Sequence, residues 1–237
     1  MIVLFFHFHF PLGNCYTLES EFTIILSSVK TKNLKKMTTI LNIKTSINGE
    51  NSASNKLSEA LISQLLKNNP ESKVLVRDLA SDPIPHMETK HFLSFEIPHE
   101  ERSNEQKEAS KYSDQALKEI EEADILVIGL PFYNFSFPST LKSWIDHISI
   151  PGKTFSYADS TPKGLLKNKK VYLNIAIGGI YEDKTIINQM EDYLRTLFAF
   201  IGITDIQVFR SEGTVFPEVR DENLSQTITD IESVLAS

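Results

Sequence analysis

Residues 131–138 combine side chains that can hold a flat, partly polar molecule. The stretch carries one amide, Asn134, among four aromatic residues, Phe132, Tyr133, Phe135 and Phe137. It follows the apolar run 123–130, which has the pattern of a buried parallel strand, and it precedes a helical pattern at 139–149. Because aromatic rings have no packing reason to gather at the end of a strand, we expect three of them to be exposed and to contact a ligand.

A second loop, the serine loop at residues 45–55, is rich in hydroxyl groups. It follows the predicted strand 38–44, contains Ser46, Ser52 and Ser54, and has no basic residue between positions 45 and 55. Hydroxyl groups and the free N–H groups of a helix start can bind a phosphate, and the helix dipole adds positive potential there. Each of Ser52 and Ser54 alone fits equally well as the N-cap of the following helix.

A third loop, Ala176-Ile177-Gly178-Gly179, follows the predicted strand 170–177. Two adjacent glycines let a ligand approach the backbone closely and expose N–H donors. An ordinary tight turn would use the same two residues.

The phosphate signatures of other nucleotide sites are missing. The chain has no GxxxxGK[ST] loop and no GxGxxG after the first strand, which disfavours a P-loop nucleotide or a tightly held dinucleotide. A serine loop that can bind one phosphate, together with an aromatic loop that can bind a flat ring, suits a mononucleotide flavin. Backbone groups around Tyr133, Asn134 and Phe135 can bond its pyrimidine edge and N5, and we expect the Asn134 amide to favour the negative charge of the reduced ring.

The elements that must position these loops alternate along the chain. Strand patterns occupy 38–44, 73–77, 123–130, 170–177 and 204–209, and helical patterns occupy 53–67, 104–121, 139–149, 184–200 and 221–236. Five such units predict an α/β flavodoxin-like fold, a doubly wound five-stranded parallel sheet of order 2-1-3-4-5 with helices on both faces. A ligand is then expected beyond strands one and three, where the winding reverses. The proline-containing stretch from Ser81 to Ser103 is predicted to be an irregular surface flap.

Composition excludes several classes of protein. The 237 residues carry a formal charge of −7, which disfavours a nucleic-acid partner. No run approaches the roughly 20 apolar residues that span a bilayer, so we expect no membrane partner. The single cysteine, Cys15, cannot form an internal disulfide or a CxxC pair.

Residues 1–36 differ from the remainder. They hold an apolar aromatic run at 1–10 and a basic end before Met37, but no basic residue precedes the run and no Ala-x-Ala site follows it. We interpret 1–36 as an N-terminal extension without function, either disordered or the product of a non-native upstream start, with a targeting segment as the alternative. Residues 37–237 are interpreted as a flavodoxin-like, FMN-binding reductase domain. His7 and His9 have too few companion ligands for a metal site.

From Met37 onward the chain resembles the FMN-dependent NADH azoreductases, also described as FMN-dependent NADH:quinone oxidoreductases. The resemblance is specific because many short motifs recur at matching spacing over the whole core. They are Lys44-Thr45-Ser46, Asn51-Ser52-Ala53-Ser54-Asn55, Val76-Arg77-Asp78-Leu79-Ala80, Pro83-Ile84-Pro85, Pro131-Phe132-Tyr133-Asn134-Phe135, Ser139-Thr140-Leu141-Lys142, Asp146-His147-Ile148, Gly152-Lys153-Thr154-Phe155 with Tyr157, Gly164-Leu165 and Phe200-Ile201-Gly202-Ile203-Thr204-Asp205.

The resemblance implies a cytoplasmic homodimer that moves a hydride from NADH or NADPH to FMN and then reduces a quinone or azo compound, without a catalytic side chain. It implies phosphate contacts from Ser46, Ser52, Ala53 and Ser54, ring contacts from Phe132, Tyr133, Asn134 and Phe135, and further contacts from Ala176, Ile177, Gly178 and Gly179. Family members often have Ser-Arg-Gly-Gly at the last site, so Ala176 and Ile177 put side-chain contacts to the pyrimidine end in doubt. Phe155 and Tyr157, with the 81–103 flap, are candidates to reach the second subunit.

Two other functions share this fold, a one-electron flavodoxin carrier and an idle FMN-binding module. A carrier needs no substrate-sized flap, and an idle module would keep the serine loop but lose turnover. His147 is predicted to be a helix-face residue and not a base, and Trp144 a packing residue in the core or an interface.

Overall fold

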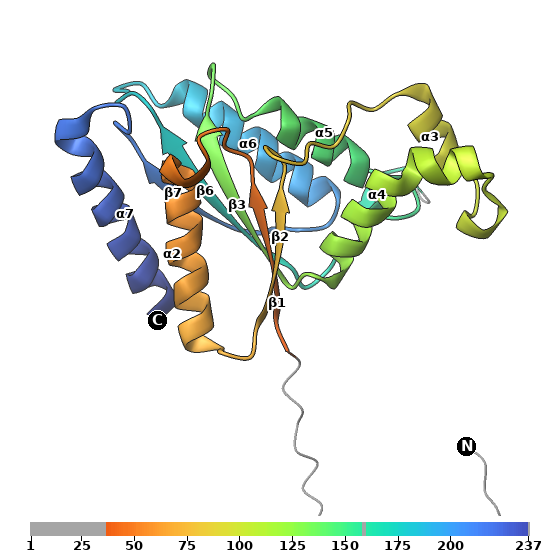
Figure 1. Cartoon of the computed structure of the whole chain (residues 1–237), viewed down its shortest axis with the longest axis horizontal. Helices are drawn as coiled ribbons and strands as arrows, with labels where there is room; N and C mark the ends of the chain where they lie inside the picture. Colours follow the sequence, from red (N-terminus) through yellow and green to blue (C-terminus); the bar gives the residue numbers. More distant parts are fainter. Residues whose placement is uncertain (1–36, 158–159, 237) are drawn as a thin grey trace, which may run out of the picture. The chain divides into compact units, whose positions relative to one another are not determined.

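Strands rich in isoleucine, valine and leucine build a five-stranded parallel sheet (Figure 1). The computed structural model describes residues 37–157 and 160–236. The sheet order is β2-β1-β3-β6-β7, which confirms the predicted order 2-1-3-4-5. The strands are β1 (Thr39–Lys44), β2 (Lys73–Asp78), β3 (Ile125–Phe132), β6 (Lys170–Ile177) and β7 (Asp205–Ser211).

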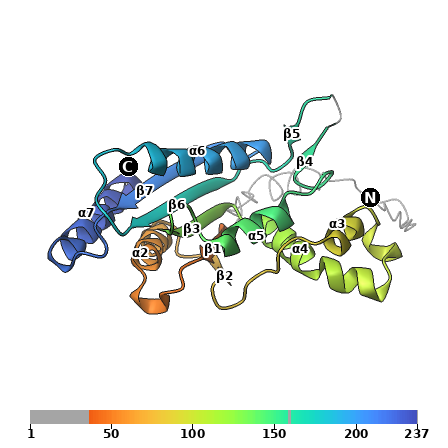
Figure 2. The same cartoon turned by 90° about the horizontal axis from the view of Figure 1, so that it is seen from above.

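Helices cover both faces of the sheet because neighbouring strand residues point to opposite sides. In β1, Ile40 packs with α2 (Ala53–Asn68) and α7 (Pro217–Ala236), which lie side by side (Figures 1 and 2). Leu41 and Ile43 belong to the larger core on the other face. That core contains residues of α4 (Asn104–Glu122), α5 (Ser139–Ile148) and α6 (Thr185–Phe200). Both faces of the central strands β1, β3 and β6 are therefore buried, as their continuous apolar sequence predicted, whereas the edge strands β2 and β7 are partly exposed.

The segment from Ser81 to Ser103 is more ordered than predicted. It contains helix α3 (Thr89–Phe95), which packs on α4, and the short 3₁₀ helix η2 (His99–Glu101). A reciprocal capping box between Glu88 and His91 starts α3. The expectation of a wholly irregular flap was wrong because this cap and the burial of His91 stabilise a helix between the prolines.

Two buried side chains of α5 fix this region to the core. Trp144 is fully buried, so its role is core packing. His147 is also fully buried; its Nε2 lies 3.0 Å from the Pro85 carbonyl oxygen and its Nδ1 lies 2.6 Å from the Ser113 hydroxyl. Because a carbonyl oxygen only accepts, Nε2 carries the proton and Nδ1 accepts from Ser113 in the neutral ring. The helix face that carries His147 thus faces α4 and the start of the 81–103 segment, not solvent.

Other elements are small or differ at their ends. The serine loop contains η1 (Gly49–Asn51), and a two-stranded antiparallel sheet joins β4 (Phe155–Ser156) to β5 (Lys163–Gly164). Strand β3 runs to Phe132 instead of ending at residue 130, and α7 begins at Pro217, before the predicted start at 221. The predictions for residues 1–36, which include His7, His9 and Cys15, lie outside the described residues.

The described ranges contain neither a bilayer-spanning helix nor a cluster of metal ligands. None of their helices combines the length and the apolar character that a bilayer crossing requires. Within the same ranges, no three His, Cys, Asp or Glu side chains gather closely enough to bind a metal ion.

Candidate functional site

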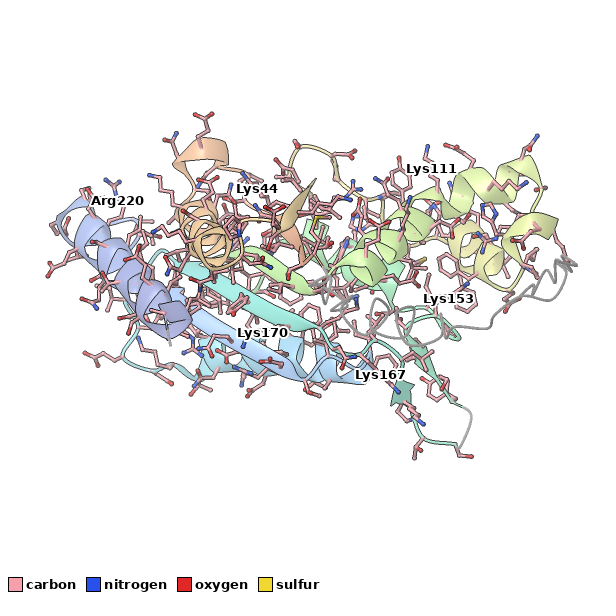
Figure 3. All side chains as sticks on the ribbon, turned by 90° about the horizontal axis from the view of Figure 1, so that it is seen from below. Lys44, Lys111, Lys153, Lys167, Lys170 and Arg220 are labelled. Atoms are coloured by element: carbon pink, nitrogen blue, oxygen red, sulfur yellow. The ribbon has the colours of Figure 1, made fainter. Side chains whose placement is uncertain are left out.

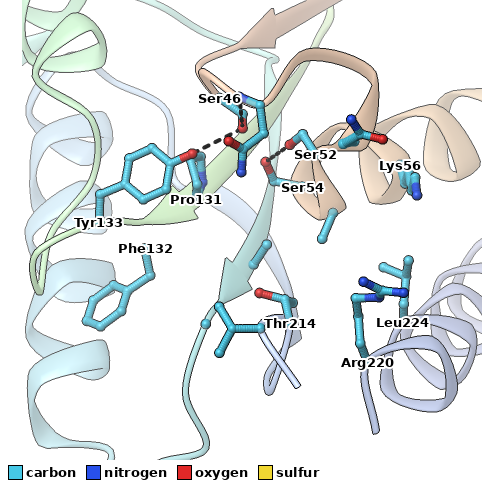
Figure 4. A pocket seen from close by; sticks show the side chains of 16 residues that line it. Ser46, Ser52, Ser54, Lys56, Pro131, Phe132, Tyr133, Thr214, Arg220 and Leu224 are labelled. Atoms are coloured by element: carbon cyan, nitrogen blue, oxygen red, sulfur yellow. Dashed lines mark hydrogen bonds between the residues drawn. The ribbon is translucent and has the colours of Figure 1, made fainter. Parts of the chain in front are cut away.

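A cavity of about 490 Å³ lies at the carboxyl ends of β1, β3 and β6 (Figure 4). This is the place that the reversal of winding in a doubly wound sheet predicts. Its walls come from the serine loop, from residues 131–133, from the end of β6 and from the segment 214–224. One half is lined mainly by hydroxyl and amide groups, and the other includes the aromatic side chains of Phe132 and Tyr133.

The serines at the start of α2 are buried and bonded to one another. The Ser52 Oγ accepts a hydrogen bond from the Asn55 N–H at 3.2 Å, so Ser52 is the N-cap of α2. The Ser52 and Ser54 hydroxyl oxygens lie 3.0 Å apart, and both residues line the cavity. Since the first N–H groups of a helix have no partner within it, this wall offers hydroxyl and N–H donors together.

Gly129 lets α2 approach β3 beneath this wall. A Cβ at Gly129 would lie 3.2 Å from the Asn55 Oδ1 and 3.1 Å from the Ser58 Oγ. The Asn55 Nδ2 in turn donates to the Gly49 carbonyl oxygen at 3.0 Å, which holds η1 against the helix start. Strand β3 therefore supports the start of α2, and Asn55 of α2 in turn holds the serine loop in place.

The aromatic loop after β3 is a tight two-residue turn. Tyr133 and Ser136 exchange two backbone hydrogen bonds of 2.8 and 2.9 Å, and the residues between them have positive φ, 48° at Asn134 and 65° at Phe135. Both values lie in the left-handed region, as in type I′ turns, where Asn-Gly is preferred. A phenylalanine in that conformation is strained, because its side chain disfavours the positive φ that glycine adopts freely.

Only one ring of this loop is largely exposed, so the expectation of three exposed rings was wrong. Phe135 is 59% exposed, whereas Phe132 is buried and Tyr133 and Phe137 are half-buried. The extension of β3 places Phe132 in the sheet, and Phe132, Phe135 and Tyr181 contact one another edge to face. Phe137 stacks on Tyr193 with ring centroids 5.5 Å apart.

The cavity brings together eight of the twelve predicted site residues. These are Ser46, Ser52, Ala53, Ser54, Phe132, Tyr133, Ala176 and Gly178. The other four, Asn134, Phe135, Ile177 and Gly179, do not line it. Ile177 is fully buried in the large core because alternate residues at the end of β6 point to opposite faces. Asn134 is exposed in a separate hollow beside Ser139, and Phe135 faces an apolar groove with Met190 and Tyr193.

The loop after β7 forms a wall that the sequence analysis missed. The Gly213 N–H donates to the Gly179 carbonyl oxygen and the Thr214 N–H to the Ile177 carbonyl oxygen, both at 3.0 Å. Gly213 has a φ of +73°, and it carries the chain across the end of β6 so that Thr214 lines the cavity. Gly213, two residues after the end of β7, was the available signal for a turn at this place. The remaining lining residues that were not predicted as site residues are Asn48, Asn51, Lys56, Pro131, Val215, Arg220 and Leu224.

An ion pair holds the neighbouring 178–184 loop in place. The Lys184 Nζ donates to the Glu212 carboxylate at 2.6 Å, and Glu212 also lies 3.3 Å from the Tyr181 N–H. This pair joins the loops after β6 and β7, so the aromatic ring of Tyr181 stays beside Phe132.

Comparisons with known proteins agree with this geometry. A model of the flavodoxin-like fold family matches residues 38–235. The FMN-dependent NADH:quinone oxidoreductase of Herminiimonas arsenicoxydans is 39% identical over 202 residues, which cover 84% of this chain and 99% of the relative. The protein of the same description from Alcanivorax borkumensis is 42% identical over 174 residues, covering 73% and 87%.

Solved structures give the same result. An azoreductase from Bacillus anthracis str. Sterne is 27% identical with a TM-score of 0.74, covering 84% of this chain and 99% of the other. An FMN-dependent NADH-azoreductase from Bacillus anthracis str. Ames Ancestor, solved in complex with FMN, is also 27% identical, with a TM-score of 0.72 and coverage of 84% and 98%.

Proposed function

This chain belongs to the FMN-dependent NADH:quinone oxidoreductase family, which has the flavodoxin-like fold, and we propose that the cavity beyond β1, β3 and β6 holds its FMN. The protein is an oxidoreductase that uses FMN and NADH and reduces quinones or azo compounds. The observation that carries the proposed site is the pairing of a buried hydroxyl wall with an aromatic wall in one cavity.

The residues present suit FMN. Ser52, Ser54 and the N–H groups of the first turn of α2 would bind the phosphate, because they combine donors with the positive end of a helix dipole. Phe132 and Tyr133 would pack against the ring system, and the glycine backbone at Gly178 leaves room for its edge. When bound, FMN supplies the two-electron chemistry, taking a hydride from NADH and passing the electrons to a quinone or azo compound.

The protein itself orients the reactants and limits the access of water. Tyr181 and Phe135 lie beside Phe132 and form an apolar rim, which favours flat aromatic substrates over water. We propose a ping-pong order, in which the oxidised nicotinamide leaves before the acceptor enters the same opening. A reaction that consumes NADH must occur where NADH is supplied, which supports the proposed cytoplasmic location. NADPH as an alternative donor stays a prediction.

Steady-state kinetics test this function. Purified protein with NADH and menadione or methyl red is expected to oxidise NADH, with parallel double-reciprocal lines as the acceptor concentration changes. A one-electron carrier or an idle FMN-binding module would bind flavin without catalysing this turnover. Absence of acceptor-dependent NADH oxidation by flavin-loaded protein would therefore contradict the proposal.

We also propose a homodimer in which the apolar groove beside the aromatic loop meets the second subunit. The groove is lined by Phe135, Phe137, Ile186, Met190 and Tyr193, together with polar neighbours. Tyr157 is 60% exposed and stands edge to face on Phe155, which is itself buried against Phe200. Phe155 thus braces Tyr157, and Tyr157 is the better candidate to reach across. Light scattering tests this proposal, and a fully active monomer would contradict it.

The domain boundary at Met37 is a related proposal. Contacts group Met37–Ser237 into one compact unit, and the family match spans residues 38–235. A shortened chain that begins at Met37 is expected to bind FMN and to melt like the full chain. A large loss of flavin content on shortening would overturn this boundary.

A further inference from the structure

Two basic side chains stand at the hydroxyl-lined end of the cavity. Lys56 belongs to α2 and Arg220 to α7, and both line the cavity that contains Ser52 and Ser54. Figure 4 shows the two basic residues on the side of the cavity that lies away from Phe132 and Tyr133. Among the described residues that line this cavity, Lys56 and Arg220 are the only ones with charged side chains.

This positive charge is local. The whole chain has a formal charge of −7, and the basic residues labelled in Figure 3 are spread over different elements, such as Lys111 on α4 and Lys170 in β6. Arg220 is therefore not part of a broad basic surface. A cavity that collects two positive charges in an acidic protein is suited to an anion.

The fold does not explain the position of the two side chains. Helices α2 and α7 pack through apolar residues such as Leu57, Leu61 and Ile231, whereas Lys56 and Arg220 are exposed. Arg220 pairs with its neighbour Asp221 at 2.8 Å, and both partners are exposed. An exposed pair of this kind adds little to stability and leaves guanidinium N–H groups available.

We infer that Arg220 from α7 and Lys56 from α2 bind the phosphate group of FMN beside the serine wall. The inference rests on the proposed function. It assigns two basic residues to the phosphate, which the serine loop cannot supply because positions 45–55 contain no basic side chain. A phosphate monoester carries close to two negative charges, which hydroxyl groups and a helix dipole neutralise only in part. Guanidinium N–H groups make charge-assisted hydrogen bonds to phosphate oxygens, and an ammonium group adds a point charge.

The arrangement also joins two helices through the ligand. Arg220 lies in the first turns of α7 and Lys56 in the first turns of α2. An anion held by both would fix the 214–224 segment over the cavity. Riboflavin, which has the same ring system but no phosphate, would gain nothing from either side chain.

Titration of flavin-free protein with FMN and with riboflavin tests the inference through the quenching of flavin fluorescence. We expect R220A to weaken FMN binding about tenfold and K56A to weaken it less, because an ammonium lacks the paired donors of a guanidinium. Riboflavin binding is expected to change by less than about twofold. The charge-conserving variant R220K should recover part of the affinity, and added salt should weaken FMN binding more steeply in the wild type than in R220A.

The control variant is K118A, because Lys118 is exposed on α4 and its ion pair with Glu122 is long, at 4.0 Å. It should bind both flavins like the wild type. Unchanged FMN affinity in R220A, or an equal loss for FMN and riboflavin, would overturn the inference while the proposed function stands. Failure of the wild type to bind FMN at all would instead contradict the proposed function.

Discussion

The Ser46 Oγ lies 3.3 Å from the Tyr133 hydroxyl, and this contact joins the loop after β1 to the loop after β3 across the cavity (Figure 4). The Ser46 Oγ also lies 3.3 Å from the Asn48 N–H, which donates to it. The two loops come from strands that are neighbours in the sheet but 87 positions separate the two residues. This hydrogen bond therefore connects the serine wall of the cavity to its aromatic wall.

Removal of this link should loosen the bound flavin. We expect Tyr133→Phe to weaken FMN binding about two- to tenfold, because one neutral hydrogen bond contributes about 0.5–1.5 kcal/mol. Ser46→Ala should have a similar effect, and the double variant should lose less than the sum of the two. Flavin titration measures all three. Full additivity would show that the two hydroxyls act independently.

The two serines of α2 should separate capping from phosphate binding. Ser52→Ala removes the N-cap and should lower the free energy of unfolding by about 1 kcal/mol as well as weakening FMN. Ser54 is in the first turn and does not cap, so Ser54→Ala should weaken FMN with a smaller loss of stability, which comes from its hydrogen bond to the Ser52 hydroxyl. Denaturant unfolding of the flavin-free protein and titration with FMN and riboflavin measure the two effects. If both flavins lose affinity equally, the serines serve only the fold.

Asn134 tests whether an amide in the aromatic turn supports reduction. Glycine accepts the φ of +48° without strain, so Asn134→Gly keeps the turn and removes the amide. A lost hydrogen bond to developing charge corresponds to about 1.5–3 kcal/mol, which would slow reduction by NADH about ten- to a hundredfold. The Asn134 side chain lies in a separate hollow outside the cavity lining, so the predicted slowing requires the amide to reach the flavin from there. Stopped-flow bleaching of the flavin by NADH measures the effect. Reduction of Asn134→Gly by NADH at the wild-type rate would show that Asn134 serves only the turn.

Buried histidines should make stability depend on pH. Burial lowers the pKa of His147 and of His91 below the ordinary value of 6.5, and their rings lie 5.3 Å apart. The unfolded chain therefore binds protons before the native state does, so stability is complete above about pH 6.5 and falls as the pH drops below it. The melting temperature should decrease from about pH 7.5 to about pH 5.5. The variant His147→Gln should be less stable and less sensitive to pH. An equally steep decrease in this variant would assign the effect to other groups.

The sheet order and the serine loop were predictable because both depend on local patterns. Apolar runs separated by amphipathic helices determine a doubly wound sheet, and its reversal places the loop of Ser46 opposite that of Tyr133. The side to which a residue points was not predictable in a strand whose two faces are both buried. The strand was predicted at 170–177, the bounds that β6 has, but Ile177, assigned to the site from the family resemblance, points into the large core, whereas Ala176 lines the cavity.

The contribution of β7 and α7 to the cavity wall depends on tertiary contacts alone. Thr214 and Arg220 reach the cavity because the loop after β7 bonds to the end of β6 and because α7 starts at Pro217. Gly213 indicates a turn after the last strand, but no local pattern shows which cavity that turn lines. The cap that forms α3 was visible as residue types at 88 and 91, but its pairing of a glutamate with a histidine departs from the usual box.

Stopped-flow absorbance of the flavin tests the central claim most directly. Flavin-loaded protein mixed with NADH in the absence of oxygen should lose the yellow colour of its FMN in one phase, and a second mixing with menadione should restore it completely. The serine-wall variant Ser54→Ala, loaded with excess FMN, should show the same two steps, because the flavin ring and not the phosphate accepts and donates the electrons. Flavin that stays yellow with NADH, or that bleaches but is not reoxidised by menadione, would contradict the account of this protein as an FMN-dependent NADH:quinone oxidoreductase.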